Sequence, residues 1–316
     1  MTVVGAIDCG TNSIRLLITR ADEQGKLHDL EREMRVVRLG EGVDATGAFS
    51  EAALERTFAA TREYAELLRL QGVENVRFAA TSASRDVSNR DAFVSGIQEI
   101  LGVTPEVITG VEEANLSFAG AVSAVGQSEK STVVMDLGGG STEFVVGNNE
   151  GVSGALSLNI GCVRLTERHK VQAPVTAQQR ELVEADVRAS LETLTRELDF
   201  SSVTRIVGVA GTVTTVTAQV LGLTTYDPDA INGSELSIDV VQKAANELAA
   251  MNREERLATG FMHPGRADVI GTGAIIWSQA LSYLQEQIPG ISNVIISEHD
   301  ILDGIALSLL ESGTAR

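Results

Sequence analysis

The feature that most constrains the fold is a glycine-rich turn between two apolar stretches, Asp136-Leu137-Gly138-Gly139-Gly140-Ser141-Thr142-Glu143. Residues 131–135 and 144–147 have the apolar, β-branched character of strands, so the segment predicts a β-hairpin. Glycines tolerate positive φ and allow several backbone N–H groups to converge on one anion. The turn therefore predicts a phosphate-binding site, and a tight hairpin with two solvated acids is the simpler alternative.

Two carboxylates, Asp136 and Glu143, flank this turn. Carboxylates beside a phosphate usually indicate a cation, because the anions otherwise repel one another. Mg²⁺ prefers oxygen ligands of this kind. The pair therefore predicts Mg²⁺ or Mn²⁺ as the cofactor.

An earlier stretch repeats the pattern. Asp8-Cys9-Gly10-Thr11-Asn12-Ser13 follows a short apolar strand at residues 3–7 and precedes another at residues 14–18. Both turns read Asp-x-Gly-x-x-Ser, and each opens one half of the chain. Two such hairpins predict a duplicated architecture.

The length of 316 residues is enough for two domains, each with its own core. A polar stretch at residues 127–130 predicts the boundary, which gives domains at 1–128 and 129–316. The last helix, expected at about residues 300–312, has the alternative of packing back on the first domain.

Charge and composition exclude several classes of protein. Lys and Arg number 25 and Asp and Glu 43, so the net charge of −18 argues against a nucleic-acid or anionic-membrane partner. An anionic substrate then needs metal ions and local arginines. We expect a cytoplasmic protein, because residues 1–5 lack the character of a signal peptide and no apolar run is long enough to span a membrane. Cys9 and Cys162 fit a reducing compartment, with Cys9 as a small buried side chain.

Three further segments carry candidate residues. A predicted strand at residues 76–80 ends in hydroxyl residues and Arg85, a common ligand-binding edge, unless Arg85 pairs with Asp86 or Asp91 on the surface. A predicted helix begins with Glu112 and Glu113, whose simplest role is to complement the helix dipole.

The third segment is a strand at residues 205–210 that meets a helix at Gly211 and Thr212, a further phosphate-type corner. Helix starts are predicted by capping residues at Ser50, Thr176 and Asn252.

Together these features resemble the actin, sugar kinase and Hsp70 ATPase superfamily and, within it, the exopolyphosphatase and guanosine pentaphosphate phosphatase (Ppx/GppA) family. The resemblance covers nearly the whole chain. It rests on residues 8–13, Thr81 with Arg85 and Asn89, residues 110–114, 136–143, 161–164, 210–212 and 265–268. It implies an α/β fold of two actin-like (ribonuclease H-like) domains flanking an active-site cleft.

The resemblance also implies the reaction, which is hydrolysis of the terminal phosphate of inorganic polyphosphate or of the 5′ phosphate of guanosine pentaphosphate. By similarity the general base is Glu113, and the metal-associated acids are Asp136 and Glu143, with Asp8 as a further candidate. The phosphate-contacting residues it implies, with the third corner added, are Asn12, Ser13, Arg85, Gly138, Gly139, Gly140, Ser141, Gly211 and Thr212.

Two departures from the family pattern affect the expected substrate. Longer members carry additional C-terminal helical domains that hold long polyphosphate, so we expect this chain to prefer short polymers and to release them between cleavages. Near the end, the family often has Arg-Glu-Gly where this chain has Leu302-Asp303-Gly304, so a contact from that arginine is absent or supplied elsewhere. The choice between polyphosphate and guanosine pentaphosphate stays open, as does the oligomeric state, for which a homodimer is one option.

Two rival functions share these features. A sugar or acetate kinase has the same fold, although a zinc motif found in one kinase group of this length is missing here. A sensor that binds polyphosphate or an alarmone without catalysis would keep the glycine turns but would not need Glu113. Release of phosphate from polyphosphate with Mg²⁺ separates the three functions.

Overall fold

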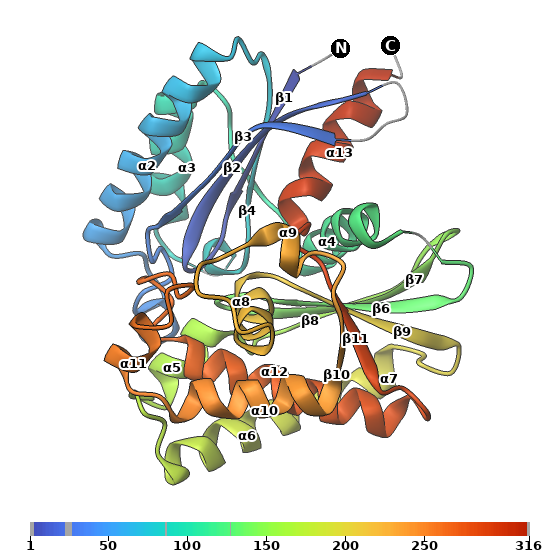
Figure 1. The fold of residues 1–316 in the computed structure, drawn as a ribbon. Coiled ribbons are helices and arrows are strands. Elements are labelled where there is room, and N and C mark those ends of the chain that lie inside the picture. The colour runs from blue at the N-terminus through green and yellow to red at the C-terminus, as the bar shows by residue number, and fades with distance from the viewer. Residues whose placement is uncertain (1–2, 23–26, 86, 127, 315–316) are drawn as a thin grey trace. The chain divides into compact units, whose positions relative to one another are not determined.

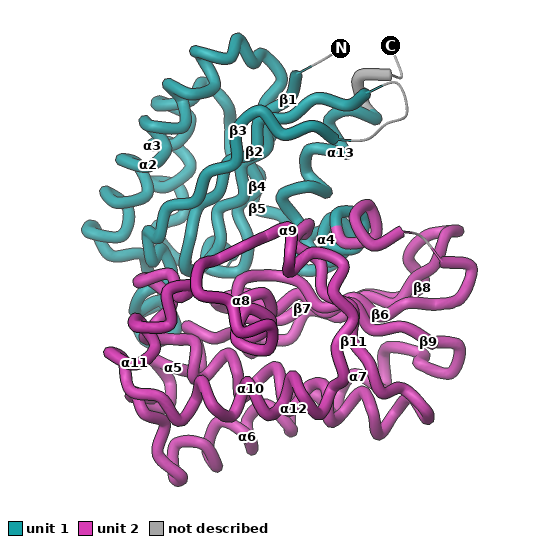
Figure 2. The backbone as a smooth tube through the Cα atoms, in the orientation of Figure 1, with its two compact units in different colours: residues 1–120, 301–316 teal, residues 121–300 magenta. Residues whose placement is uncertain are grey.

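The computed structural model describes residues 3–22, 27–85, 87–126 and 128–314, which form an α/β fold with two mixed sheets (Figure 1). The chain divides into two compact units, residues 1–120 with 301–316 and residues 121–300 (Figure 2). In the described part of the chain, no helix combines the length and the apolar character needed to cross a membrane.

The first unit is built on a five-stranded sheet. Its elements are β1 (Val3–Cys9), β2 (Ser13–Ala21), β3 (Leu27–Val36), α1 (Val43–Thr46), α2 (Glu51–Leu70), β4 (Asn75–Ala80), the 3₁₀ helix η1 (Ser82–Ser84), α3 (Arg90–Leu101), β5 (Glu106–Val107), α4 (Gly110–Val125) and α13 (Ile301–Thr314). The strand order is β3-β2-β1-β4-β5. β2 is antiparallel to both of its neighbours, whereas β1, β4 and β5 are parallel.

The central strand β1 is buried on both faces, which explains its nearly continuous apolar sequence. On one face, Ile7 belongs to a core cluster that includes Tyr64 of α2 and Phe93 of α3. On the other face, Val4 belongs to a cluster that includes Leu116 of α4 and Leu302 of α13. The alternation of side chains along the strand thus places a helical layer on each side of the sheet.

The terminal helix α13 is part of this first unit. Leu302, which stands where the family often has arginine, is 1% exposed and lies in the apolar core. The next residue, Asp303, is fully buried and forms an ion pair with Arg32 of β3. Helix α13 therefore packs on β1 and β2, as in the alternative that the sequence left open.

The second unit is built on a six-stranded sheet. Its elements are β6 (Ser131–Leu137), β7 (Thr142–Asn148), β8 (Gly151–Leu158), α5 (Cys162–Arg168), α6 (Ala177–Leu191), α7 (Leu194–Glu197), β9 (Val203–Val209), α8 (Gly211–Val220), α9 (Pro228–Ile231), β10 (Glu235–Ser237), α10 (Ile238–Ala250), α11 (Arg253–Leu257), α12 (Ile270–Gln287) and β11 (Asn293–Ile296). The strand order is β10-β11-β9-β6-β7-β8. α12 carries the fully buried Trp277 and packs against α6 and α10.

The two sheets have the same construction. In each unit the first strand lies in the centre, an antiparallel second and third strand lie on one side, and parallel strands lie on the other. The second unit adds only the short antiparallel strand β10 at its edge. The duplicated architecture predicted from the two hairpins is therefore confirmed by the topology.

Local sequence signals fix most helix starts. Complete capping boxes form at Thr176 before α6 and at Asn252 before α11, and the Ser50 hydroxyl accepts a hydrogen bond at the start of α2. The division between the units falls within α4, between Gly120 and Ala121, whereas the polar residues around 128 lie in the connection from α4 to β6. Gln127 itself lies outside the described residues.

Candidate functional site

The glycine turn of the second unit presents backbone donors on one side only. The N–H of Gly138 donates to the carbonyl oxygen of Ser141 at 3.0 Å, which closes the turn. Among the described residues, the N–H groups of Gly139, Gly140 and Ser141 donate to no other residue. Converging N–H groups of this kind favour an anion.

The carbonyl oxygens of the same turn are held by α5. Those of Gly138 and Gly139 accept the backbone N–H groups of Cys162 and Val163 at 3.1 and 2.8 Å. The close packing requires glycine at 161, because a Cβ there would lie 2.3 Å from the Gly139 carbonyl oxygen. The start of α5 thus fixes the turn with its acceptors occupied and its donors turned away from the helix.

The two acids that flank this turn lie side by side. Asp136 on β6 and Glu143 on β7 are paired in register, so both side chains project from the same face of the sheet. They are 6% and 1% exposed, and Glu143 accepts a hydrogen bond from the Ser157 hydroxyl at 2.6 Å. Two carboxylates in this position are unfavourable unless a proton or a cation is shared between them. The donor set therefore fits a divalent cation.

No group of three or more His, Cys, Asp or Glu side chains suited to a metal occurs in the described residues. A cation held by Asp136 and Glu143 would therefore complete its shell with oxygen atoms of water and substrate. Mg²⁺ is usually bound in this way, through one or two carboxylates and substrate phosphates.

The first turn is built like the second. The N–H of Gly10 donates to the carbonyl oxygen of Ser13 at 2.9 Å, and the carbonyl oxygens of Thr11 and Asn12 accept N–H groups from the segment after β3. Within the described residues, the N–H groups of Thr11 and Asn12 have no acceptor. Asn12 and Ser13, two of the predicted phosphate contacts, therefore occupy a second turn with outward-facing donors.

The two hairpins differ in one respect that matters chemically. Asp8 is paired in register with Arg15, at the position that corresponds to Glu143 in the second hairpin. The Arg15 guanidinium donates twice to one Asp8 oxygen, at 2.7 and 3.0 Å. An arginine thus neutralises the acid of the first turn, whereas the second turn keeps two acids. Sequence reasoning overlooked Arg15, although its spacing from Asp8 equals that of Glu143 from Asp136.

A third group in the first unit joins Arg85 and Glu113. Arg85 follows η1, and its guanidinium forms an ion pair with Glu113 and donates to the Ile108 carbonyl oxygen at 3.2 Å. Glu113, in the first turn of α4, is 7% exposed. The partner of Arg85 in the structure is therefore a predicted site residue, and Asp86 lies outside the described residues.

The neighbouring glutamate has a different environment. Glu112 forms an ion pair with Arg77 at 2.6 Å, and its side chain is 44% exposed. Adjacent helical residues point about 100° apart, which explains why one glutamate is buried while the other faces water.

The third corner lies at the start of α8. The backbone reaches it through Ala210, whose φ of 74° and ψ of 170° are a conformation that side chains rarely adopt. The guanidinium of Arg266 covers Gly211 so closely that a Cβ there would lie 2.2 Å from it. Thr212 is 5% exposed and, like Cys162, adjoins Gly273 of α12. Sequence reasoning noted residues 265–268 as a motif but assigned Arg266 no role.

Both cysteines are inert components of these turns. Cys9 is fully buried, as the sequence predicted, and Cys162 is 7% exposed. Burial raises the pKa of both thiols, most strongly for Cys9, where Asp8 adds to the effect. Reactive cysteines have lowered pKa values, so neither thiol is a candidate nucleophile.

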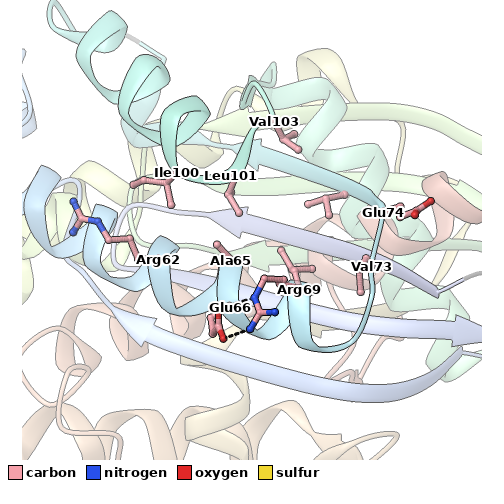
Figure 3. Close-up of a pocket in the computed structure, with 11 residues that line it drawn as sticks. Arg62, Ala65, Glu66, Arg69, Val73, Glu74, Ile100, Leu101 and Val103 are labelled. Atoms are coloured by element: carbon pink, nitrogen blue, oxygen red, sulfur yellow. Dashed lines mark hydrogen bonds and ion pairs between the residues drawn. The ribbon is translucent and has the colours of Figure 1, made fainter.

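A hollow on the first unit is separate from these groups (Figure 3). It is lined by Arg62 and Arg69 of α2 and by apolar residues such as Val73 and Leu101. It includes Val76 at the beginning of β4, whereas η1 and Arg85 follow the other end of that strand. The arginines that line it are paired with Glu55 and Glu66, so the hollow offers no free positive charge among the described residues.

Known proteins share this fold and sequence over their full length. The model of the Ppx/GppA phosphatase family matches residues 17–312. The chain is 49% identical to the protein named exopolyphosphatase 2 of Mycobacterium tuberculosis, with 98% of this chain and 99% of that protein covered. It is 32% identical to a bifunctional 3-dehydroquinate synthase/phosphatase of Fusobacterium nucleatum, covering 97% of this chain and 46% of that protein.

Solved structures agree. A crystal structure described as an exopolyphosphatase-like protein superimposes with a TM-score of 0.93 at 43% identity, over 97% of both chains. A crystal structure of the Aquifex aeolicus member of the Ppx/GppA family gives a TM-score of 0.82 at 29% identity, with 99% of this chain and 98% of that chain covered.

Proposed function

Because the chain belongs to the Ppx/GppA phosphatase family, we propose that it is an exopolyphosphatase, which hydrolyses the terminal phosphate of inorganic polyphosphate. The observation that carries the proposal is the pair of turns whose backbone donors face outward, one of them beside two buried acids. Similarity over the whole length to a protein named exopolyphosphatase supports the choice of substrate.

Asp136 and Glu143 would hold the divalent cation, Mg²⁺ or Mn²⁺. When bound, the cation neutralises negative charge on the phosphoryl oxygens. Asp8 is a weaker candidate as a ligand, since Arg15 already neutralises it. Placing the cation in the second hairpin agrees with the register of its two acids.

Glu113 would act as the general base. Its carboxylate takes a proton from water, the water oxygen forms a bond to the terminal phosphorus, and the bond from that phosphorus to its bridging oxygen breaks. The products are inorganic phosphate and a polymer shortened by one unit. The ion pair with Arg85 orients the carboxylate and places a guanidinium where it can also contact a phosphate.

The remaining residues would bind the phosphates. Backbone N–H groups of Gly138, Gly139 and Gly140 serve as donors together with the hydroxyl of Ser141, and Asn12 and Ser13 do so in the first turn. At the third corner, the N-terminus of α8 at Gly211 and Thr212 adds further donors.

The direct test is phosphate release from polyphosphate with Mg²⁺, run beside guanosine pentaphosphate at equal concentration. We expect faster release from polyphosphate. A clear preference for guanosine pentaphosphate would favour the alternative, 5′-phosphohydrolysis of that nucleotide, which the family name also covers. Transfer to a sugar or to acetate without release to water would indicate a kinase, and binding without turnover would indicate a sensor.

A further inference from the structure

We propose that Arg256, a buried residue outside the groups described above, is a positioning residue that holds Arg266 at the start of α8. The inference deepens the proposed function, because it rests on phosphate binding at this corner. Arg256 is 1% exposed, so its guanidinium is removed from water almost completely. In the described part of the chain it forms no ion pair with a carboxylate.

Its donors go to backbone carbonyl oxygens instead. Arg256 donates to Leu248 at 3.1 Å and to Ala249 at 3.4 Å, both in the last turn of α10, and to Ala267 at 2.8 Å. The C-terminal end of a helix carries partial negative charge, which compensates in part for the buried cation. Burial nevertheless lowers the pKa of Arg256. A buried charge with only neutral acceptors is costly, which indicates a position under a specific constraint.

The contact to Ala267 is the important one, because Ala267 directly follows Arg266. The backbone turn that precedes α12 is closed by Arg266, whose carbonyl oxygen accepts from Ile270 at 2.9 Å. The Arg266 side chain leaves this turn toward α8, covers Gly211 and donates to the Thr215 hydroxyl at 3.3 Å. Arg256 therefore ties the end of α10 to the segment from which Arg266 projects.

A second glycine makes room for this arrangement. Gly271 lies in the first turn of α12, and a Cβ there would be 2.4 Å from the Arg256 guanidinium. Replacing Gly271 by alanine therefore displaces the guanidinium without removing the charge. This gives a second way to disturb the contact if Arg256 variants fold poorly.

The experiment is a double-mutant cycle with two readouts, KM and kcat for polyphosphate and the calorimetric Kd for inorganic triphosphate with Mg²⁺. Arg256→Lys keeps the charge but loses the fork of donors. We expect it to raise KM and Kd about tenfold with kcat changed less than about twofold, as loss of one charge-assisted contact would do. Gly271→Ala should act in the same direction.

The decisive comparison is made in an Arg266→Ala background. If Arg256 acts through Arg266, Arg256→Lys should raise KM and Kd by less than about twofold there, while its effect on Tm is undiminished. A full tenfold effect in that background would overturn the inference, as would an Arg266→Ala variant with unchanged Kd. Failure of the proposed function is distinguishable, because it would appear as absent phosphate release in the parent, and Kd would still decide the role of Arg256.

Discussion

Two adjacent glutamates at the start of α4 face different surroundings, and only one is suited to proton transfer. Glu113 is buried beside Arg85, whereas Glu112 pairs with Arg77 at the surface. A positioned base contributes about 10² to 10⁴ in rate. We therefore expect Glu113→Gln to lower kcat by that factor with little change in KM.

The matched control is Glu112→Gln, which should stay within about tenfold of the parent, an effect below about 1.4 kcal/mol on the barrier. Both variants should be measured with polyphosphate at saturating Mg²⁺, with Tm recorded to verify folding. An inactive Glu112→Gln beside an active Glu113→Gln would show that the base is assigned to the wrong residue.

The cysteines provide a test of burial at single residues. Because burial raises the pKa of Cys9 and Cys162 and the thiolate is the reactive form, neither should react with a disulfide reagent at pH 8 in the native protein. Both should react in concentrated urea. Raising the pH toward 9 should leave native labelling slow, since the pKa values of the folded state lie above the ordinary range. Rapid native labelling of either residue would contradict its placement.

At the scale of elements, the two hairpins are equivalent in backbone and opposite in charge. Asp136 faces Glu143, and Asp8 faces Arg15. Without metal, we expect Asp136→Asn to stabilise the protein by up to about 1 kcal/mol, because it removes a repulsion between like charges on neighbouring strands. The same variant should abolish phosphate release and lose the rise in Tm that Mg²⁺ causes in the parent.

The matched control is the equivalent change in the first hairpin. Asp8→Asn breaks an ion pair, so it should lower Tm in EDTA and retain the Mg²⁺-dependent rise. Thermal melts of the parent and the two variants, each in EDTA and in Mg²⁺, give the comparison. Equal Mg²⁺ responses of the parent and Asp136→Asn would place the cation elsewhere, and full activity in excess EDTA would refute a metal requirement.

The same hairpins show what a sequence can and cannot reveal. Each turn is encoded locally, by glycines between two apolar strands, and was therefore predicted together with the duplication. Ser157, which donates to Glu143, lies on β8 and has no local signal, because its contact depends on the register of a third strand. Helix α5 was overlooked because its start is fixed by carbonyl oxygens of the distant glycine turn instead of a side-chain cap.

The division between units was also beyond local reasoning. The polar residues around 128 indicate an exposed connection, whereas the division lies at Gly120 within a continuous helix. Composition shows where the chain meets water, but the grouping of α13 with the first unit follows from packing between residues far apart in sequence. Leu302 and Asp303 contribute to that packing through the core and the contact with Arg32.

For the whole molecule, the net charge of −18 opposes the approach of any polyanion. At an ionic strength of about 0.01 M the Debye length is about 30 Å, so most of the molecule's charge acts on an approaching polymer. At about 0.1 M it falls to about 10 Å, and only charges near the bound phosphates remain effective. Salt should therefore weaken the general repulsion more than the local attraction by Arg85 and the backbone donors.

We accordingly expect kcat/KM for long polyphosphate to rise by at least about twofold between about 0.01 and 0.1 M KCl at a fixed, saturating concentration of Mg²⁺. The matched control is triphosphate, whose smaller charge should give a smaller rise with the same enzyme. Initial rates at substrate concentrations well below KM measure the quantity directly. A fall in kcat/KM with added salt would mean that the arginines and the bound cation, and not the net charge, dominate the field that an incoming polymer meets.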